Sequence, residues 1–215
     1  MHPPEDRELP SNRAIYGSDT GVLGKVAAGL ARTDLTAVLV AWDSLGYDLA
    51  PKLLRIYMRD EGPNHNYRFD SAEIRKIVKT SAVQRAAAAS LDEVKDLARA
   101  DPRIGTTREI TPAGWIGNVE ISDDDDLANA LGHFDVAVGT DTTVYTADDG
   151  SLRAEMDYRI YVYDYYNFDL KGDHLININP AKTINNEARQ LEEAGWARAF
   201  KSRGESALQH WSGTL

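Results

Sequence analysis

The chain of 215 residues contains no cysteine. Disulfide bridges, thiolate-bound zinc and thiol nucleophiles are therefore excluded. It also lacks a run of about 18 consecutive apolar residues, the length that a membrane-spanning helix requires. Its opening stretch, MHPPEDRELPSNR, has no apolar core of the kind that secretory signals carry. Glycine-rich nucleotide-binding motifs are missing too, which counts against binding of dinucleotides and nucleoside triphosphates, and without a serine nucleophile motif serine hydrolysis has no support.

Positive charge is scarce in this sequence. There are 24 Lys and Arg residues against 34 Asp and Glu, a formal net charge of −10. Non-specific affinity for nucleic acids depends on Lys and Arg, so we expect no nucleic-acid partner. The hydrophobic fraction of 42% is too high for a disordered chain, and the length suits one domain with a substantial core.

The first half of the chain has the periodicity of helices. Over residues 19–102, apolar side chains recur at spacings of three and four. Gly29 and Gly46 are expected to mark joints between successive helices, and a further helical run is predicted from Ser71 to about Ala100. The apolar positions that set the first part of the pattern are Val22, Val26, Leu30, Val38, Val40 and Trp42.

The second half, residues 103–215, changes to the two-residue period of β-strands. Segments 133–146 and 151–168 alternate apolar and polar residues, and the ADDGS turn between them predicts a hairpin. The even-numbered side chains of the second segment are expected to face the core.

Beyond this hairpin, residues 171–185 are expected to be a loop. Residues 186–194 predict a short helix that ends at Gly195, and SALQHW predicts a last strand.

These patterns together predict an α+β fold, in which an N-terminal helical half packs on a curved antiparallel β-sheet. Residues 1–18 are rich in proline and charge and are interpreted as a flexible lead-in. Residues 19–215 are expected to form a single domain, with its helical part at 19–102 and its mainly β part at 103–215.

The acidic run Asp123–Asp126 has two interpretations. It lacks the alternate spacing and the central glycine of a calcium-binding loop. Acidic residues are favourable at the start of a helix, so we interpret the run as a solvated helix start with Ser122 as its cap. The nearby His133 is expected to be a structural or surface histidine.

Asp164 interrupts the apolar side of the second hairpin segment. The strand could end near Tyr163, in which case Asp164 would begin a solvated turn. Alternatively the strand continues, and the carboxyl group must then be hydrogen-bonded, paired with a charge or placed where the core opens to water. The sequence leaves both possibilities open.

The residues around Asp164 resemble a known motif. The run DYYNFD, residues 164–169, followed by His174, is similar to the Asp-x-Tyr-Asp-Phe-Asn element and downstream His-Arg pair of colicin M-like bacteriocins. That family is α+β, with a helical part ahead of a curved sheet. Its members act in the periplasm, where they cut lipid II between the undecaprenyl carrier and the pyrophosphoryl head group, and they need Mg²⁺.

The resemblance implies a catalytic set of four residues: Asp164, Tyr166, Asn167 and His174. Two positions depart from the family pattern, because Asn167 stands where a second acid is expected and Leu175 stands where an arginine should follow His174. Asp169 or Asp173 could supply the missing acid, and the resemblance implies Asp164, Asp169 and Asp173 as Mg²⁺ ligands.

The missing positive charge has two candidate replacements, Lys171 and Arg159. In the mechanism that the resemblance implies, the histidine protonates the leaving group or activates water. Tyr166 would orient the phosphate by a hydrogen bond.

A second resemblance covers more of the chain. Short segments between residues 44 and 205, among them YRIYVYDYYNFD and LEEAGWARAFKSRGES, are similar to C-terminal modules of bacterial polymorphic toxins. That likeness implies delivery by a secretion system or a longer carrier chain, and a cognate immunity protein.

We therefore expect an antibacterial toxin domain, secreted and acting in the target cell envelope or periplasm on lipid II or another undecaprenyl-pyrophosphate sugar carrier. The alternative is a non-enzymatic module on the same scaffold that binds an envelope component, with a degenerate active site. A structural or carrier role in a secreted assembly also stays open. The tyrosine-rich strand, with Tyr158, Tyr161, Tyr163, Tyr165 and Tyr166, is expected either to pack or to contact sugar or lipid.

Overall fold

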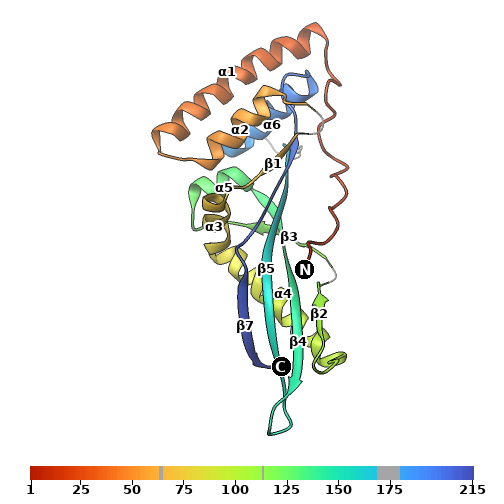
Figure 1. Ribbon diagram of the computed structural model, residues 1–215. Coiled ribbons are helices and arrows are strands. Elements are labelled where there is room, and N and C mark those ends of the chain that lie inside the picture. The colour runs from red at the N-terminus through yellow and green to blue at the C-terminus, as the bar shows by residue number, and fades with distance from the viewer. Residues whose placement is uncertain (63–64, 113, 169–179) are drawn as a thin grey trace.

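The computed structural model describes residues 1–62, 65–112, 114–168 and 180–215 (Figure 1). Within these ranges the chain forms helices and one seven-stranded mixed sheet, so the predicted α+β class is confirmed. The helices are α1 (Val22–Ser44), α2 (Leu49–Arg59), α3 (Ser71–Lys79), α4 (Ser81–Ala100), α5 (Asp125–Leu131) and α6 (Pro180–Glu193). The strands are β1 (Asn66–Arg68), β2 (Thr107–Ile110), β3 (Ile116–Glu120), β4 (His133–Thr146), β5 (Leu152–Tyr166), β6 (Phe200–Glu205) and β7 (Gln209–Thr214).

The sheet is built around the long β4–β5 hairpin, as the alternating sequence predicts. The main strand order is β1-β6-β5-β4-β2, with β3 beside β4 and β7 beside β5. All pairs are antiparallel except β1 with β6. The hairpin register runs without interruption from Asp135 opposite Tyr163 to Thr146 opposite Leu152. The β5 side chains Met156, Ile160 and Val162 are buried, which confirms that the even side faces the core.

The α1 helix is continuous and forms the outer layer at one end of the molecule (Figure 1). Gly29 lies inside it, so the expected joint there is wrong, whereas Gly46 does separate α1 from α2. The buried side of α1 consists of Ala28, Ala31, Leu35, Leu39 and Trp42. Val22, Val26, Leu30 and Val40 satisfy the same helical period but are exposed.

The helical run that begins at Ser71 is divided by Thr80 into α3 and α4. Asp70 caps α3 by accepting hydrogen bonds from the backbone N–H groups of Ala72 and Glu73, while the Glu73 side chain accepts from the Asp70 N–H. This reciprocal arrangement satisfies donors that the first helical turn leaves unpaired.

The acidic run caps three different helices. Asp124, and not Ser122, is the cap of α5, because its side chain accepts a hydrogen bond from Leu127 N at 3.0 Å. Asp123 accepts from Ser81 N, at the start of α4, at 2.9 Å. The Asp126 carboxylate accepts from the backbone N–H groups of Asp48, Leu49 and Ala50, at the start of α2. The run therefore joins α2, α4 and α5 at their positive ends.

The C-terminal part differs from the prediction in three places. The expected last strand at residues 206–211 is present as β7, but it runs from Gln209 to Thr214. The helix α6 begins at Pro180, so the expected loop 171–185 is wrong over its last six residues; residues 171–179 lie outside the described ranges. Gly195, with φ of +78°, follows α6 as predicted. The strand β6 was not predicted, and it lies between β5 and β1.

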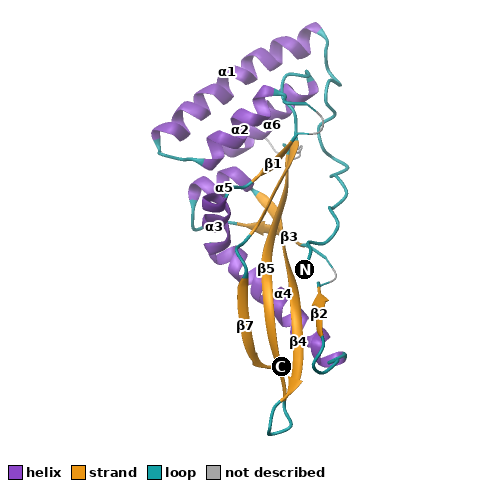
Figure 2. Cartoon of the chain, viewed as in Figure 1, coloured by secondary structure: helices purple, strands orange, loops and turns teal. Residues whose placement is uncertain are grey.

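Residues 1–18 lie along the side of the molecule opposite α3 and α5 (Figure 2). Trp115 Nε1 donates to the carbonyl of Glu5 at 2.8 Å, and Asp6 pairs with Lys201 and Arg203 at 2.8 and 3.1 Å. The segment approaches β4 so closely that a Cβ at Gly139 would lie 2.8 Å from the carbonyl oxygen of residue 2. Whether the segment is flexible, as expected, stays a prediction.

None of the helices in the described ranges combines the length and apolar character that crossing a membrane would require.

Candidate functional site

Asp164 lies inside β5 and not in a solvated turn. The strand continues through Tyr166, and Asp164 is paired in register with Ser202 of β6. Asp164 is only 5% exposed, and Ser202 Oγ donates a hydrogen bond to its Oδ2 at 3.3 Å. The interpretation in which the strand ends near Tyr163 is therefore wrong, and Asp164 is a buried carboxyl group on the core side of the sheet.

The surroundings of Asp164 favour its protonated form. Burial raises its pKa well above the usual range; the Ser202 hydrogen bond lowers it in part, and the charge of Asp135 adds to the increase. Within the described residues, no basic side chain forms an ion pair with Asp164. A buried carboxyl group held neutral in this way can donate a proton.

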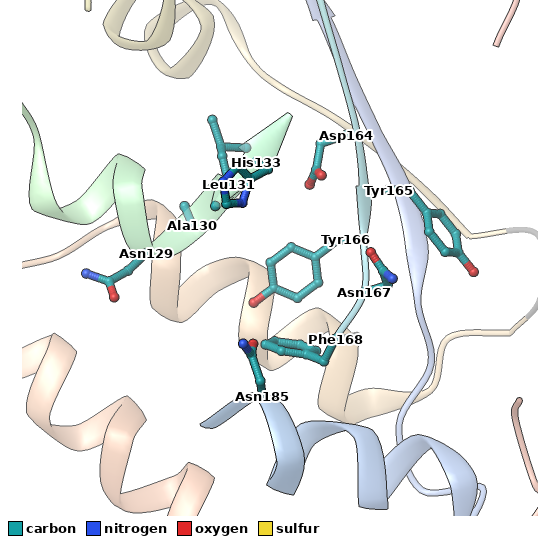
Figure 3. Close-up of a pocket in the computed structure, with 11 residues that line it drawn as sticks. Asn129, Ala130, Leu131, His133, Asp164, Tyr165, Tyr166, Asn167, Phe168 and Asn185 are labelled. Atoms are coloured by element: carbon teal, nitrogen blue, oxygen red, sulfur yellow. The ribbon is translucent and has the colours of Figure 1, made fainter. Parts of the chain in front are cut away.

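Asp164 opens into a pocket of about 170 Å³. The pocket is lined by the end of β5 and the two residues beyond it, by residues 129–133 at the junction of α5 and β4, and by Asn185 of α6. Figure 3 shows the Asp164 carboxyl group and the rings of Tyr166 and Phe168 on one side of the strand, with Tyr165 on the other. Three of the four predicted catalytic residues, Asp164, Tyr166 and Asn167, therefore line one pocket.

Tyr166 is held in an aromatic cluster. Its ring stacks on Phe200 at 5.0 Å between centroids and meets Tyr57 and Phe168 edge-on at 5.9 and 5.4 Å. Burial, with the neighbouring Asp164 charge, raises the pKa of Tyr166, so its phenol remains protonated. Contacts of this kind fix a ring through packing alone, and they give Tyr166 a structural role whether or not it touches a substrate.

A second buried acid provides a comparison. Glu192 of α6 is 3% exposed, and burial raises its pKa. Both of its oxygens have partners: Tyr57 Oη donates to Oε2 and Ala199 N donates to Oε1, each at 3.0 Å. This carboxyl group ties α2, α6 and the segment before β6 together, so its burial has a structural explanation. Asp164, in contrast, accepts one hydrogen bond of 3.3 Å, from Ser202, and lines a pocket.

His133, which was expected to be a structural or surface histidine, lines the same pocket as Asp164. Its side chain is 52% exposed and its Nε2 lies 3.7 Å from Glu120 Oε2. His133 begins β4, with one residue between it and the end of α5, and the β3–β4–β5 pairing brings this strand end toward the end of β5. The only signal in the sequence was the expected antiparallel hairpin, which places the start of one strand beside the end of the other.

Several predicted site residues lie outside the described residues: Asp169, Asp173 and His174, together with Lys171 and Leu175. Their roles stay predictions. Arg159, the other candidate for the missing positive charge, is not among the residues that line the Asp164 pocket. Its guanidinium donates to the carbonyl of Ser206 at 2.7 Å.

The described part of the pocket does not fit a Mg²⁺ ion. Asp164 is its one carboxyl group, and its raised pKa opposes the ionised form that Mg²⁺ needs. Nowhere in the described ranges do three His, Asp or Glu side chains form a group that could hold a metal ion. The predicted Mg²⁺ site therefore depends on Asp169 and Asp173.

Comparisons of the chain with protein-family models, with curated proteins and with solved structures found no match.

Proposed function

We propose that this protein is an antibacterial toxin domain that hydrolyses the phosphodiester bond of an undecaprenyl-pyrophosphate sugar carrier such as lipid II. The observation that carries the proposal is Asp164, a buried carboxyl group with a raised pKa that lines a pocket at the end of β5. The substrate class comes from the resemblance of residues 164–169 to colicin M-like bacteriocins. Secretion, action in the target cell envelope and a cognate immunity protein belong to the same proposal.

The proposed reaction assigns one proton transfer to each of two residues. Water attacks the phosphorus atom that carries the undecaprenyl oxygen, and His133 accepts the proton that this water loses. The bond between phosphorus and the undecaprenyl oxygen breaks, and Asp164 donates its proton to that oxygen. The products are the free alcohol and the pyrophosphorylated head group.

The experiment is a cleavage assay with lipid II and Mg²⁺, with a parallel reaction in EDTA. Asp164→Asn keeps the shape of the side chain and removes the acid, and we expect it to lower head-group release about 100-fold or more. Asp157→Asn, on the opposite, exposed side of the same strand, is the matched control and should cleave like the parent. Equal cleavage by the parent and Asp164→Asn would contradict the proposal.

The packing of Tyr166 favours a second candidate, a non-enzymatic module that binds an envelope component. Three aromatic neighbours account for this ring without any substrate. Asn167 and Leu175 also depart from the family pattern. Binding of lipid II without release of the head group, by the parent and by Asp164→Asn alike, would support this second function.

A further inference from the structure

The scarce positive charge of this chain gathers in one cleft at the edge of the sheet. The cleft, of about 640 Å³, lies between α3, the end of β1 and the second half of β6, and is called the edge cleft below. Five of its fifteen lining residues are Arg or Lys, against 24 in the 215 residues of the chain. They are Arg68, Arg75, Lys79, Arg159 and Arg203, and Glu205 is the one acid among the lining residues.

Three of these five cations have no ion pair within the described residues: Arg68, Arg75 and Lys79. Arg203 pairs with Asp6 at 3.1 Å, and Arg159 lies 3.9 Å from Glu205. The two charges within each of these pairs cancel. The three unpaired cations therefore leave the cleft with a charge of +3. In a chain with ten more acids than bases, such a surplus points to an anionic ligand.

An adjoining pocket of about 260 Å³ supplies an independent observation. It shares Arg68, Arg203, Gly204 and Glu205 with the edge cleft and is also lined by Tyr163. Tyr163 is 3% exposed, and its hydroxyl group has no hydrogen-bond partner in the described part of the chain. Burial raises the pKa of Tyr163 to about 12, so the hydroxyl group keeps its proton and can donate. An unpaired buried donor costs free energy, which the oxygen of an anion would recover.

We propose that the edge cleft and its adjoining pocket bind a ligand that carries a diphosphate group. Two or three negative charges match the three unpaired cations, and the planar guanidinium groups of Arg68 and Arg75 suit paired phosphate oxygens. Phe69, Ile74 and Val78 add an apolar wall beside the charges. Asp6, which now pairs with Arg203, occupies the position of a competing anion.

This site is separate from the pocket at Asp164. Tyr163 and Asp164 are neighbours on β5, so their side chains point to opposite sides of the sheet. The pocket at Asp164 has no lining residue in common with the edge cleft or with its adjoining pocket. The inference therefore does not depend on the proposed hydrolysis, and Asp164→Asn should leave this binding unchanged within twofold.

The test is calorimetric titration of the full chain with inorganic pyrophosphate in EDTA at low salt. We expect Arg75→Gln/Lys79→Gln, two exposed positions on α3, to weaken binding at least tenfold. Lys25→Gln/Arg32→Gln removes the same charge from exposed positions on α1 and should bind within twofold of the parent. Asp6→Asn should tighten binding, and orthophosphate should bind at least tenfold more weakly than pyrophosphate.

Absence of pyrophosphate binding by the parent would overturn the inference, as would equal weakening in the two double variants. Weaker binding by Asp6→Asn would contradict the role given to the charges, and equal affinity for orthophosphate would contradict the diphosphate class.

Discussion

At the scale of single residues, Asp164 differs from Glu192, the other buried acid among the described residues, in how little compensates its burial. Glu192 is equally buried but accepts from a phenol and a backbone amide, whereas Asp164 accepts one hydrogen bond of 3.3 Å from Ser202. An uncompensated buried carboxyl group destabilises the folded state unless it remains protonated. Such groups occur where a protein needs an acid at neutral pH.

Replacing Asp164 by Asn should therefore stabilise the protein at neutral pH. The folded state holds the Asp164 proton more tightly than the unfolded chain, in which the pKa is near 3.8. The free energy of unfolding of the parent should fall, relative to Asp164→Asn, as the pH rises from 3.8 toward the folded-state pKa. The expected slope is up to about 1.4 kcal/mol per pH unit.

Urea unfolding of the parent and Asp164→Asn between pH 3 and pH 8 measures this difference. A constant difference between the parent and Asp164→Asn over this range would contradict a raised pKa.

The alternation of β5 was enough to place Asp164 on the core side, but not to decide whether it was buried. That depends on β6, which alternation did not reveal because small residues, Ser202 and Gly204, follow Phe200 at its inward positions. Ser202 lies under Asp164, and at Gly204 an added Cβ would lie 3.1 Å from atoms of Phe69 and Ile74. A strand that must leave room for neighbouring side chains lacks the apolar pattern by which strands are recognised.

At the scale of helices and strands, the sequence predicted only one of the three helix starts that the acidic run caps. Acidic residues do favour the start of α5, as predicted. Their other two partners, the starts of α2 and α4, are distant in sequence, and no periodicity connects them to residues 123–126.

The capping of α2 by Asp126 leads to a prediction about stability. Its carboxylate accepts from three consecutive backbone N–H groups, so Asp126→Ala should lower the free energy of unfolding by about 1–2 kcal/mol. Asp125→Ala, at the exposed residue just before it in the same run, should cost only a few tenths of a kcal/mol. Chemical denaturation of both variants gives the comparison, and equal losses would show that Asp126 is not a cap in solution.

At the scale of the whole molecule, the N-terminal segment covers a side of the sheet that would otherwise face water. Tyr161 and Tyr163 are 4% and 3% exposed, and Trp115 packs on Tyr163 with ring centroids 5.6 Å apart. The rings of Tyr161 and Tyr163 are therefore buried by packing, and the expected alternative of an open sugar- or lipid-binding surface is wrong for them. Proline and charge in residues 1–18 predicted a flexible lead-in, and its flexibility stays a prediction. The contacts of this segment with the sheet could not be predicted, because the sequence does not show the surface on which the segment lies.

Deleting residues 1–9 should lower the free energy of unfolding by about 2 kcal/mol or more, because it uncovers aromatic side chains. Asp6→Asn removes only the partly exposed ion pairs with Lys201 and Arg203 and should cost less than about 1 kcal/mol. Urea denaturation distinguishes packing from charge. A deletion variant as stable as the parent would support the flexible lead-in expected from the sequence.

The most direct measurement is an NMR titration of the Asp164 side-chain carboxyl carbon, assigned by its loss in Asp164→Asn. Asp123 provides an internal reference, because it accepts hydrogen bonds from Ser81, chiefly from the backbone N–H group. These hydrogen bonds hold the pKa of Asp123 below its usual value. We predict that Asp164 titrates well above 3.8 and Asp123 below it. A midpoint for Asp164 at or below 3.8 would show a carboxylate that is already ionised at neutral pH, and would contradict its proposed role as the proton donor.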